Sequence, residues 1–186
     1  MKNIIKFYML TFLFTASPLF AVEGIALINL QEAILTTQTA NDAFKALEEE
    51  PDYSANMEQF QTLQADMQAI AEKLQKEQET LSQEEILEMQ KEYQEKAKDL
   101  EFVGGKLQQA RQETAQKIMM DLGQAATSIT RELMSAKQIK LLLERPAQGQ
   151  QNTSSVLDFD AELDITDDVT SMLDVLAADE ASTPTE

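Results

Sequence analysis

Apolar residues in the middle of the chain recur at intervals of three and four, which is the spacing of a coiled-coil seam. A first series consists of Phe60, Leu63, Met67, Ile70, Leu74 and Leu81. A second series consists of Ile86, Met89, Tyr93, Ala97, Leu100, Leu107, Thr114 and Ile118. Residues at this spacing form one stripe of a helix, and that stripe packs against a facing helix. The pattern therefore predicts two helices that meet along a long apolar seam.

The two seams are separated by a segment with the signature of a helix start. Ser82 stands three residues before Glu85, which matches a capping box. We therefore expect an antiparallel hairpin with its turn near residues 80–82. Its second helix, from Gln83 to Ala136, would be about 80 Å long at about 1.5 Å per residue. A compact domain of this size needs no such helix, so the sequence predicts a projecting arm over residues 51–136.

Three short segments outside the hairpin have strand character. The run from Ile25 to Leu30 is almost entirely apolar, as in a strand buried on both faces. Residues 138–143 fit either a strand or the last turns of the helix, and we favour the strand. Residues 156–160 alternate between apolar and polar. A sheet this small cannot cover itself, so we expect self-association, with contributions from Ile28, Leu142 and Leu157.

The body is therefore predicted to combine two separate parts of the chain, residues 22–50 and 137–176. Its last element is a short helix that ends near Leu176. Residues 177–186 are small, acidic and contain proline, which predicts a disordered tail.

The first 21 residues have the composition of a secretory signal peptide. Lys2 and Lys6 precede the apolar run from Phe7 to Phe14, and small residues follow up to Ala21. The apolar run is short for a membrane span, which argues against a retained anchor. We expect cleavage near Ala21 and a location in the cell envelope or outside the cell.

Composition excludes several kinds of chemistry. The 186 residues contain no cysteine, so disulfides, thiolate nucleophiles and zinc–sulfur sites are impossible. Histidine, the usual general base near neutral pH, is also absent. With 33 acidic residues against 15 Lys and Arg, the formal charge is −18, which disfavours nucleic acid as a partner. No Gly-rich phosphate loop is present, and we expect neither an enzyme nor a cofactor.

One acidic segment has the alternation of a calcium-binding loop. Its carboxylates are Asp158, Asp160, Glu162 and Asp164. The sixth position of such a loop is normally glycine and the twelfth glutamate, whereas this chain has Leu163 and Val169 there. A solvated strand face explains the segment better, and we expect no metal site.

The order of these features resembles the Skp/OmpH family of periplasmic chaperones for outer-membrane proteins. The resemblance rests on four segments: Ile25 to Gln31, Leu81 to Glu85, Tyr93 to Lys96, and Asp164 to Thr166. It implies a periplasmic homotrimer whose strands form a central body. It also implies three helical hairpins around a cavity that holds an unfolded outer-membrane protein.

Charge is the feature in which this chain departs from the family. The arms of the best-known members are basic, whereas residues 60–102 carry 5 Lys and 11 acidic residues. This difference argues against contact of the arms with lipopolysaccharide or an anionic membrane. The resulting hypothesis is an ATP-independent holdase for unfolded outer-membrane proteins. The alternative is a structural coiled-coil protein of the envelope that binds a cationic partner.

Three residues of the arm are candidates for a hinge. If the hairpin turns at Leu81, then Pro51 lies opposite Arg111, about two turns from the level of Gly104 and Gly105. Proline removes a backbone hydrogen bond, and each glycine inside a helix costs about 1 kcal/mol relative to alanine. The alternative is that the glycines only allow the helices to pack closely.

Overall fold

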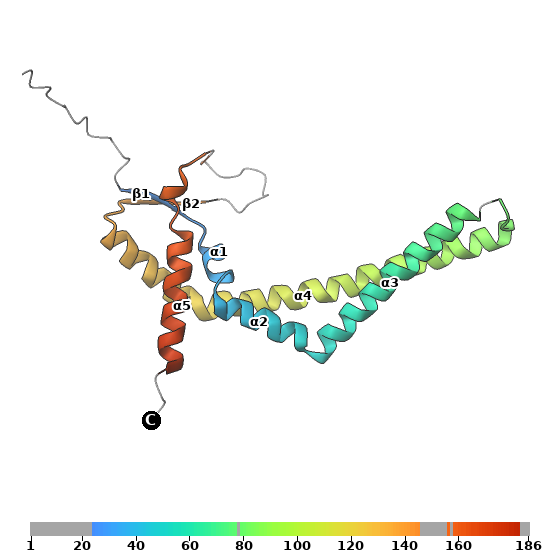
Figure 1. The fold of residues 1–186 in the computed structure, drawn as a ribbon, viewed down its shortest axis with the longest axis horizontal. Coiled ribbons are helices and arrows are strands. Elements are labelled where there is room, and N and C mark those ends of the chain that lie inside the picture. Colours follow the sequence, from blue (N-terminus) through green and yellow to red (C-terminus); the bar gives the residue numbers. More distant parts are fainter. Residues whose placement is uncertain (1–23, 78, 146–155, 157, 183–186) are drawn as a thin grey trace, which may run out of the picture.

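A long helical hairpin projects from a small body in the computed structural model, which describes residues 24–77, 79–145, 156 and 158–182 (Figure 1). The elements, in chain order, are β1 (Ile25–Ile28), α1 (Leu30–Leu35), α2 (Gln38–Glu49), α3 (Pro51–Lys76), α4 (Gln83–Ala136), β2 (Leu141–Glu144), the 3₁₀ turn η1 (Ala161–Leu163) and α5 (Thr166–Ser182). The predicted fold class is confirmed: a mainly helical chain with a small β body and a long antiparallel hairpin.

The described part of the sheet consists of two parallel strands. Ile25 of β1 lies opposite Leu141 of β2, and the register continues to Ile28 opposite Glu144. The other edge of β1 is occupied by the start of α5, because the Ile165 N–H donates to the carbonyl of Leu27 at 2.9 Å. The segment predicted at 138–143 is thus a strand, shifted toward its C-terminal end.

The strand predicted at residues 156–160 is not found among the described residues of that segment. The Asp158 carboxylate accepts from the Phe159 N–H at 2.9 Å, and the Asp160 carboxylate accepts from the Glu162 N–H at 3.0 Å. Short acidic side chains that bond to nearby amides compete with a strand ladder. The turn η1 follows this segment, with Asp160 as its N-cap, and Asp164 takes the bridge position beside Leu27.

The first six residues of the segment predicted to be disordered, residues 177–182, are helical. Helix α5 continues past Leu176 to Ser182. The added residues include three alanines, which have the highest helix propensity, and the next proline is Pro184. Residues 183–186 lie outside the described residues, as do Leu157 and the predicted signal peptide.

The helices begin at residues that suit helix starts. The Asn29 carboxamide oxygen accepts from the Glu32 N–H at 3.0 Å and caps α1. The Thr37 hydroxyl accepts from the Ala40 N–H at 3.2 Å and caps α2. Pro51 is the first residue of α3, where its missing N–H leaves no bond unmade. Pro51 therefore starts a helix at the bend between α2 and α3 (Figure 1).

The C-terminal part of α4, predicted to belong to the arm, is built into the body. Ile118, Ala126 and Ile129 share a buried cluster with Ile34 of α1 and Val169 of α5. Both Ile34 and Val169 have no exposed surface. One continuous helix therefore forms half of the arm and one wall of the body core.

Candidate functional site

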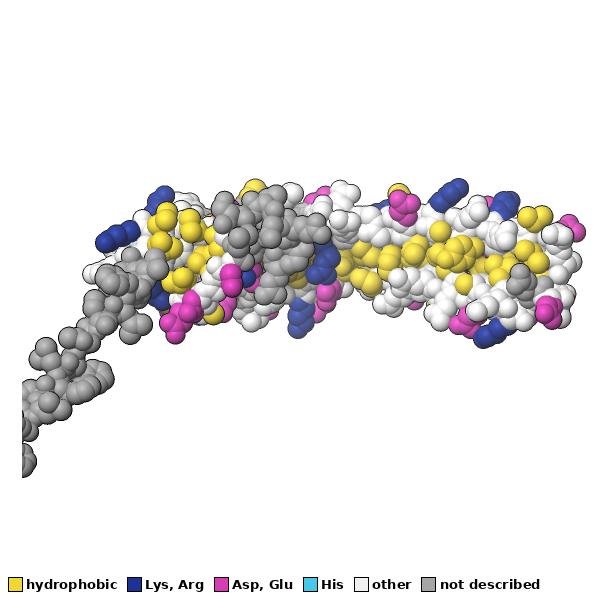
Figure 2. Space-filling view, turned by 90° about the horizontal axis from the view of Figure 1, so that it is seen from above, with side chains coloured by type: hydrophobic (Ala, Val, Ile, Leu, Met, Phe, Trp, Pro, Cys, Tyr) yellow, Lys and Arg dark blue, Asp and Glu magenta, His cyan; other side chains and the backbone are white. Residues whose placement is uncertain are grey.

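The arm carries an apolar band that a two-helix seam cannot bury completely. Leu63 and Ile70 of α3 are buried against α4. Leu87 remains 63% exposed and Tyr93 37% exposed. Figure 2 shows the hydrophobic side chains as a nearly continuous band along the arm, with charged side chains at its margins. The arm thus presents a long apolar surface to solvent.

One ion pair fixes the register of the two arm helices. The Lys96 ammonium lies 2.8 Å from a carboxylate oxygen of Asp66 on the facing helix. The hydrogen bond to Asp66 raises the pKa of Lys96 above its usual value. Residues 66 and 96 are equidistant from residue 81, which confirms the predicted level of the turn.

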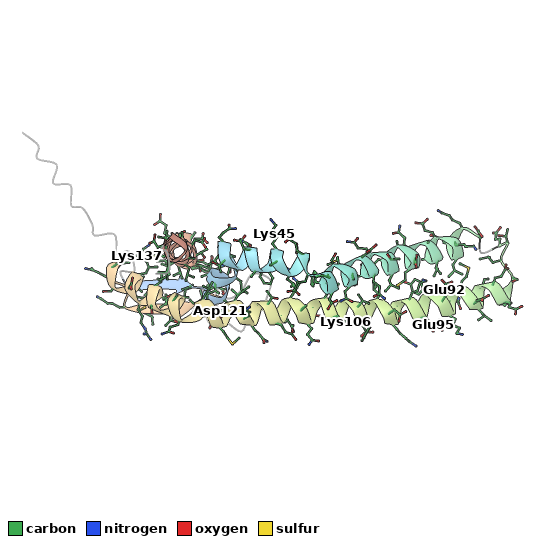
Figure 3. The ribbon with its side chains drawn as sticks, turned by 90° about the horizontal axis from the view of Figure 1, so that it is seen from below. Lys45, Glu92, Glu95, Lys106, Asp121 and Lys137 are labelled. Atoms are coloured by element: carbon green, nitrogen blue, oxygen red, sulfur yellow. The ribbon has the colours of Figure 1, made fainter. Side chains whose placement is uncertain are left out.

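Most other charges of the arm face away from the interface between the helices. Figure 3 shows Lys45 on the outer side of α2, and Glu95 and Lys106 on the outer side of α4. The Lys106 ammonium lies 4.6 Å from the centre of the exposed Phe102 ring. The charged margins keep the arm hydrated and leave the apolar band uncovered.

The predicted capping box at the tip of the arm is confirmed. The Ser82 N–H donates to the Glu85 carboxylate at 2.8 Å, and the Ser82 hydroxyl oxygen accepts from the Glu85 N–H at 3.3 Å. The hydroxyl also donates to the same carboxylate at 2.7 Å. These hydrogen bonds hold the pKa of Glu85 below its usual value.

Substitution Ser82→Ala should destabilise the first turn of α4 by about 1 kcal/mol, since it removes an N-cap. Amide hydrogen exchange at residues 84–87 should become faster. Thr62→Ala is the control, because Thr62 lies inside α3 and its hydroxyl bonds only to the carbonyl of Glu58. Exchange in α4 that is unchanged by Ser82→Ala would contradict a role for the cap.

The same cap gives a pH dependence whose sign follows from the pKa of Glu85. The pKa is lower in the folded protein, so the contribution is complete above the unfolded-state pKa, which is near 4.5. It disappears as the pH falls through the folded-state value. The difference between the parent chain and Ser82→Ala should therefore persist at neutral pH and shrink in acid.

A groove of about 580 Å³ opens where α2 and α3 bend away from α4. We call it the bend groove. Its main lining residues are Phe44, Tyr53, Met57, Phe60, Leu107 and Arg111. Tyr53 and Leu107 also belong to a second buried cluster, with Leu47, Leu63 and Val103. The groove therefore has a packed apolar floor.

The two predicted hinge glycines have different surroundings. A Cβ atom on Gly104 would lie 3.2 Å from the ring of Phe60, which is tighter than normal packing. A Cβ atom on Gly105 would meet no atom within 4 Å. Gly104 thus fits the alternative of close packing, and Gly105 has no packing reason to be glycine. A hinge at Pro51, Gly104 and Gly105 stays a prediction.

The predicted self-association residues lie on the two paired strands, as far as they are described. Ile28 is buried within the core of its own chain. Leu142 is half-buried against the same core, and its neighbour Leu141 is 48% exposed. Leu157 lies outside the described residues. Leu141 and Leu142 therefore remain available on β2, whereas Ile28 already has partners.

Sequence reasoning missed a buried ion-pair cluster at the carboxyl ends of the two strands. Arg145 is 9% exposed and contacts two carboxylates. Its Nη2 donates to Glu32 Oε2 at 2.6 Å, and its Nε lies 2.8 Å from Asp164 Oδ2. Arg145 directly follows β2, Glu32 lies on α1, and Asp164 lies between η1 and α5. No local pattern in the sequence brings them together.

The acidic segment considered for calcium uses its carboxylates elsewhere. Asp160 caps η1, and Asp164 contacts Arg145. Over residues 24–77, 79–145, 156 and 158–182, no cluster of three His, Cys, Asp or Glu side chains could hold a metal ion. Within the same residues, no helix combines the length and apolar character needed to cross a membrane.

Comparison with known proteins gives one family match. The sequence matches the family described as "Outer membrane protein (OmpH-like)" over residues 24–173. Among solved structures, the chain is similar to a candidate outer membrane chaperone (OmpH-like) from Caulobacter crescentus. The two are 20% identical, the similarity covers 84% of this chain and 86% of the other, and the TM-score is 0.45. No curated protein matches the sequence.

Proposed function

The chain belongs to the OmpH-like family, and we propose that it is a periplasmic, ATP-independent chaperone that holds unfolded outer-membrane proteins. The observation that carries this proposal is the exposed apolar band along the arm. Unfolded β-barrel proteins expose apolar strands and unpaired strand edges, which otherwise associate with one another. An apolar surface on a rigid arm can cover such segments.

The mechanism is sequestration by many weak contacts. Partly exposed side chains such as Leu87 and Tyr93 each bury only part of their surface on a client. At about 25 cal/mol per Å² of apolar surface, each such contact contributes little alone. The sum retains the client, while no single contact fixes one bound conformation. Release then needs no nucleotide.

We further propose that three copies assemble through their bodies and surround the client with three arms. Leu141 and Leu142 on β2 supply the apolar surface for this assembly, since β1 lies between β2 and the start of α5. Ile28 supports the strand from inside its own core. Cleavage of the predicted signal peptide near Ala21 would place the assembly in the periplasm.

Salt should stabilise the assembled form. Removal of the predicted signal peptide takes away Lys2 and Lys6 and no acidic residue, so a trimer would carry a charge of about −60. The Debye length falls from about 30 Å at 0.01 M salt to about 8 Å at 0.15 M, which weakens this repulsion. The thermal midpoint and the trimer fraction, measured by calorimetry and sedimentation equilibrium, should both rise with NaCl. A flat or falling response would show that local ion pairs outweigh the net repulsion.

The alternative, a structural coiled-coil protein, requires a stable partner of complementary charge on the acidic arm. Sedimentation velocity distinguishes the two. The proposed chaperone should form a complex with a urea-unfolded outer-membrane protein after dilution. It should not bind the same protein folded in detergent. Binding of neither form would favour the structural alternative.

A further inference from the structure

The bend groove differs in chemistry from the rest of the arm. Its lining includes three aromatic side chains, those of Phe44, Tyr53 and Phe60, together with Met57. Of the described residues that line it, Arg111 alone is charged. The outer arm beyond it, over residues 60–102, has 16 charged residues, of which 11 are acidic. An apolar groove with one cation thus lies next to an acidic outer arm.

Two local features shape this groove. Pro51 starts α3 in a new direction, so α2 and α3 diverge from α4 at this level (Figure 1). Gly104 forms part of the wall opposite Phe60, and a Cβ atom there would lie 3.2 Å from the ring. The absence of a side chain at Gly104 lets the Phe60 ring pack directly against α4, and this packing sets the position of the ring in the groove wall.

Arg111 has contacts that hold its side chain in place, but these contacts do not use all of its hydrogen-bond donors. Its guanidinium lies 5.3 Å from the centre of the Phe44 ring and 3.6 Å from a carboxylate oxygen of Glu48. An ideal charge-assisted hydrogen bond is about 2.7–2.9 Å long, so the Glu48 contact is a loose one. The side chain is 52% exposed. A carboxylate from a ligand can therefore reach guanidinium N–H groups that Glu48 does not use.

We propose that the bend groove binds an extended segment of an unfolded chain in which an aromatic side chain stands next to a carboxylate. The ring would lie on the apolar floor, and the carboxylate would pair with Arg111. Charge complementarity favours this occupant. A basic segment would be repelled by the Arg111 guanidinium, and an apolar segment would form no ion pair with it. This inference rests on the proposed function, because unfolded clients supply such segments.

The chain contains no tryptophan, so a tryptophan-containing peptide can be followed by fluorescence without background from the same residue in the protein. The probe is the capped peptide acetyl-Thr-Ser-Trp-Asp-Ser-Thr-amide. A second peptide has Asn in place of Asp. A third has Ala in place of Trp and serves as a competitor. The full mature chain should shift the emission of the Asp peptide to the blue and bind it about fivefold more tightly than the Asn peptide.

Two pairs of variants separate the groove from general effects. Arg111→Gln should abolish the preference for the Asp peptide, whereas Arg131→Gln, which removes the same charge from an exposed site on α4, should preserve it. Gly104→Ala should weaken binding of both tryptophan peptides by about fivefold, because the new methyl group displaces the Phe60 ring from its place in the groove wall. Gly105→Ala gains the same helix propensity but meets no atom, and should bind like the parent chain.

Other results would overturn the proposal. These are equal binding of the Asp and Asn peptides, equal loss of preference in Arg111→Gln and Arg131→Gln, or effective competition by the Ala peptide. Equal effects of Gly104→Ala and Gly105→Ala would also contradict it and would favour a hinge. If the peptides do not bind but the chain still protects an unfolded outer-membrane protein, then only the proposal about the bend groove is rejected. If the peptides bind but the chain does not protect an unfolded outer-membrane protein from aggregation, then only the chaperone proposal is rejected.

Discussion

Replacement of Arg145 by Gln is expected to lower the free energy of unfolding by about 3 kcal/mol, because it leaves the carboxylates of Glu32 and Asp164 without the cation that they share. Arg145 is buried between Glu32 and Asp164, and it links the segment after β2 to α1 and to the segment before α5. Its loss should loosen the body while the arm stays helical. Urea unfolding followed by circular dichroism measures the stability, and hydrogen exchange at β1 locates the change.

Two further variants show that the missing pairing is responsible. Arg131→Gln removes an exposed arginine from α4 and should change stability by less than about 0.5 kcal/mol. In the triple variant, Arg145→Gln is combined with Glu32→Gln and Asp164→Asn. It should recover much of the loss, since neutral amides replace the unpaired carboxylates. An Arg145→Gln chain as stable as Arg131→Gln would show that the cluster is dispensable.

Removal of the outer half of the arm should strongly weaken protection of clients. The side chains of Asp66 and Lys96 meet at 2.8 Å, so a short Gly-Ser turn can join these residues in place of residues 67–95. The truncated chain keeps the body and the bend groove but loses the exposed side chains of Leu87 and Tyr93 and the outer part of the apolar band. Because multiple weak contacts reinforce one another, about tenfold more protein should be needed to prevent client aggregation.

The oligomeric state of the truncated chain serves as the control for this experiment. In our account the body determines the oligomeric state, so the truncation should not change it. Sedimentation equilibrium should give the same association for the truncated and the full mature chain. If the truncated chain associates normally and still protects clients at the concentration used for the full chain, then the outer arm is not the client surface.

The parts of the fold that depend on local pattern were predictable from the sequence. The 3–4 spacing of apolar residues depends only on helix geometry, and Ser82 with Glu85 signals a helix start within one turn. The bounds of α4, Gln83 and Ala136, therefore agree with the sequence prediction. The parallel pairing of β1 and β2 joins residues more than a hundred positions apart, which no periodicity encodes.

Features that depend on contacts between distant segments were not predictable. Residues 156–160 alternate like a strand, but Asp158 and Asp160 cap the local backbone, and the place beside β1 is taken by Asp164. The Arg145 cluster likewise requires α1, β2 and the start of α5 to be brought together first. In both cases, acidic residues that look solvent-exposed in the sequence have specific structural roles.

The candidate site was predictable in outline only. The apolar seams predicted a long arm with an apolar surface, yet the sequence could not distinguish Gly104 from Gly105. That difference depends on the position of Phe60 on the facing helix. The meeting of Arg111 with Phe44 and Glu48 depends on the bend at Pro51, whose angle the sequence does not specify.

The most direct test of the chaperone proposal is a light-scattering assay of client aggregation. A urea-unfolded outer-membrane protein is diluted into buffer without nucleotide, with or without the mature chain at a few-fold molar excess. Our account predicts strong suppression of scattering without ATP, and it predicts that the client remains able to fold when a bilayer is added. Scattering that is unchanged by the mature chain would contradict the proposed function.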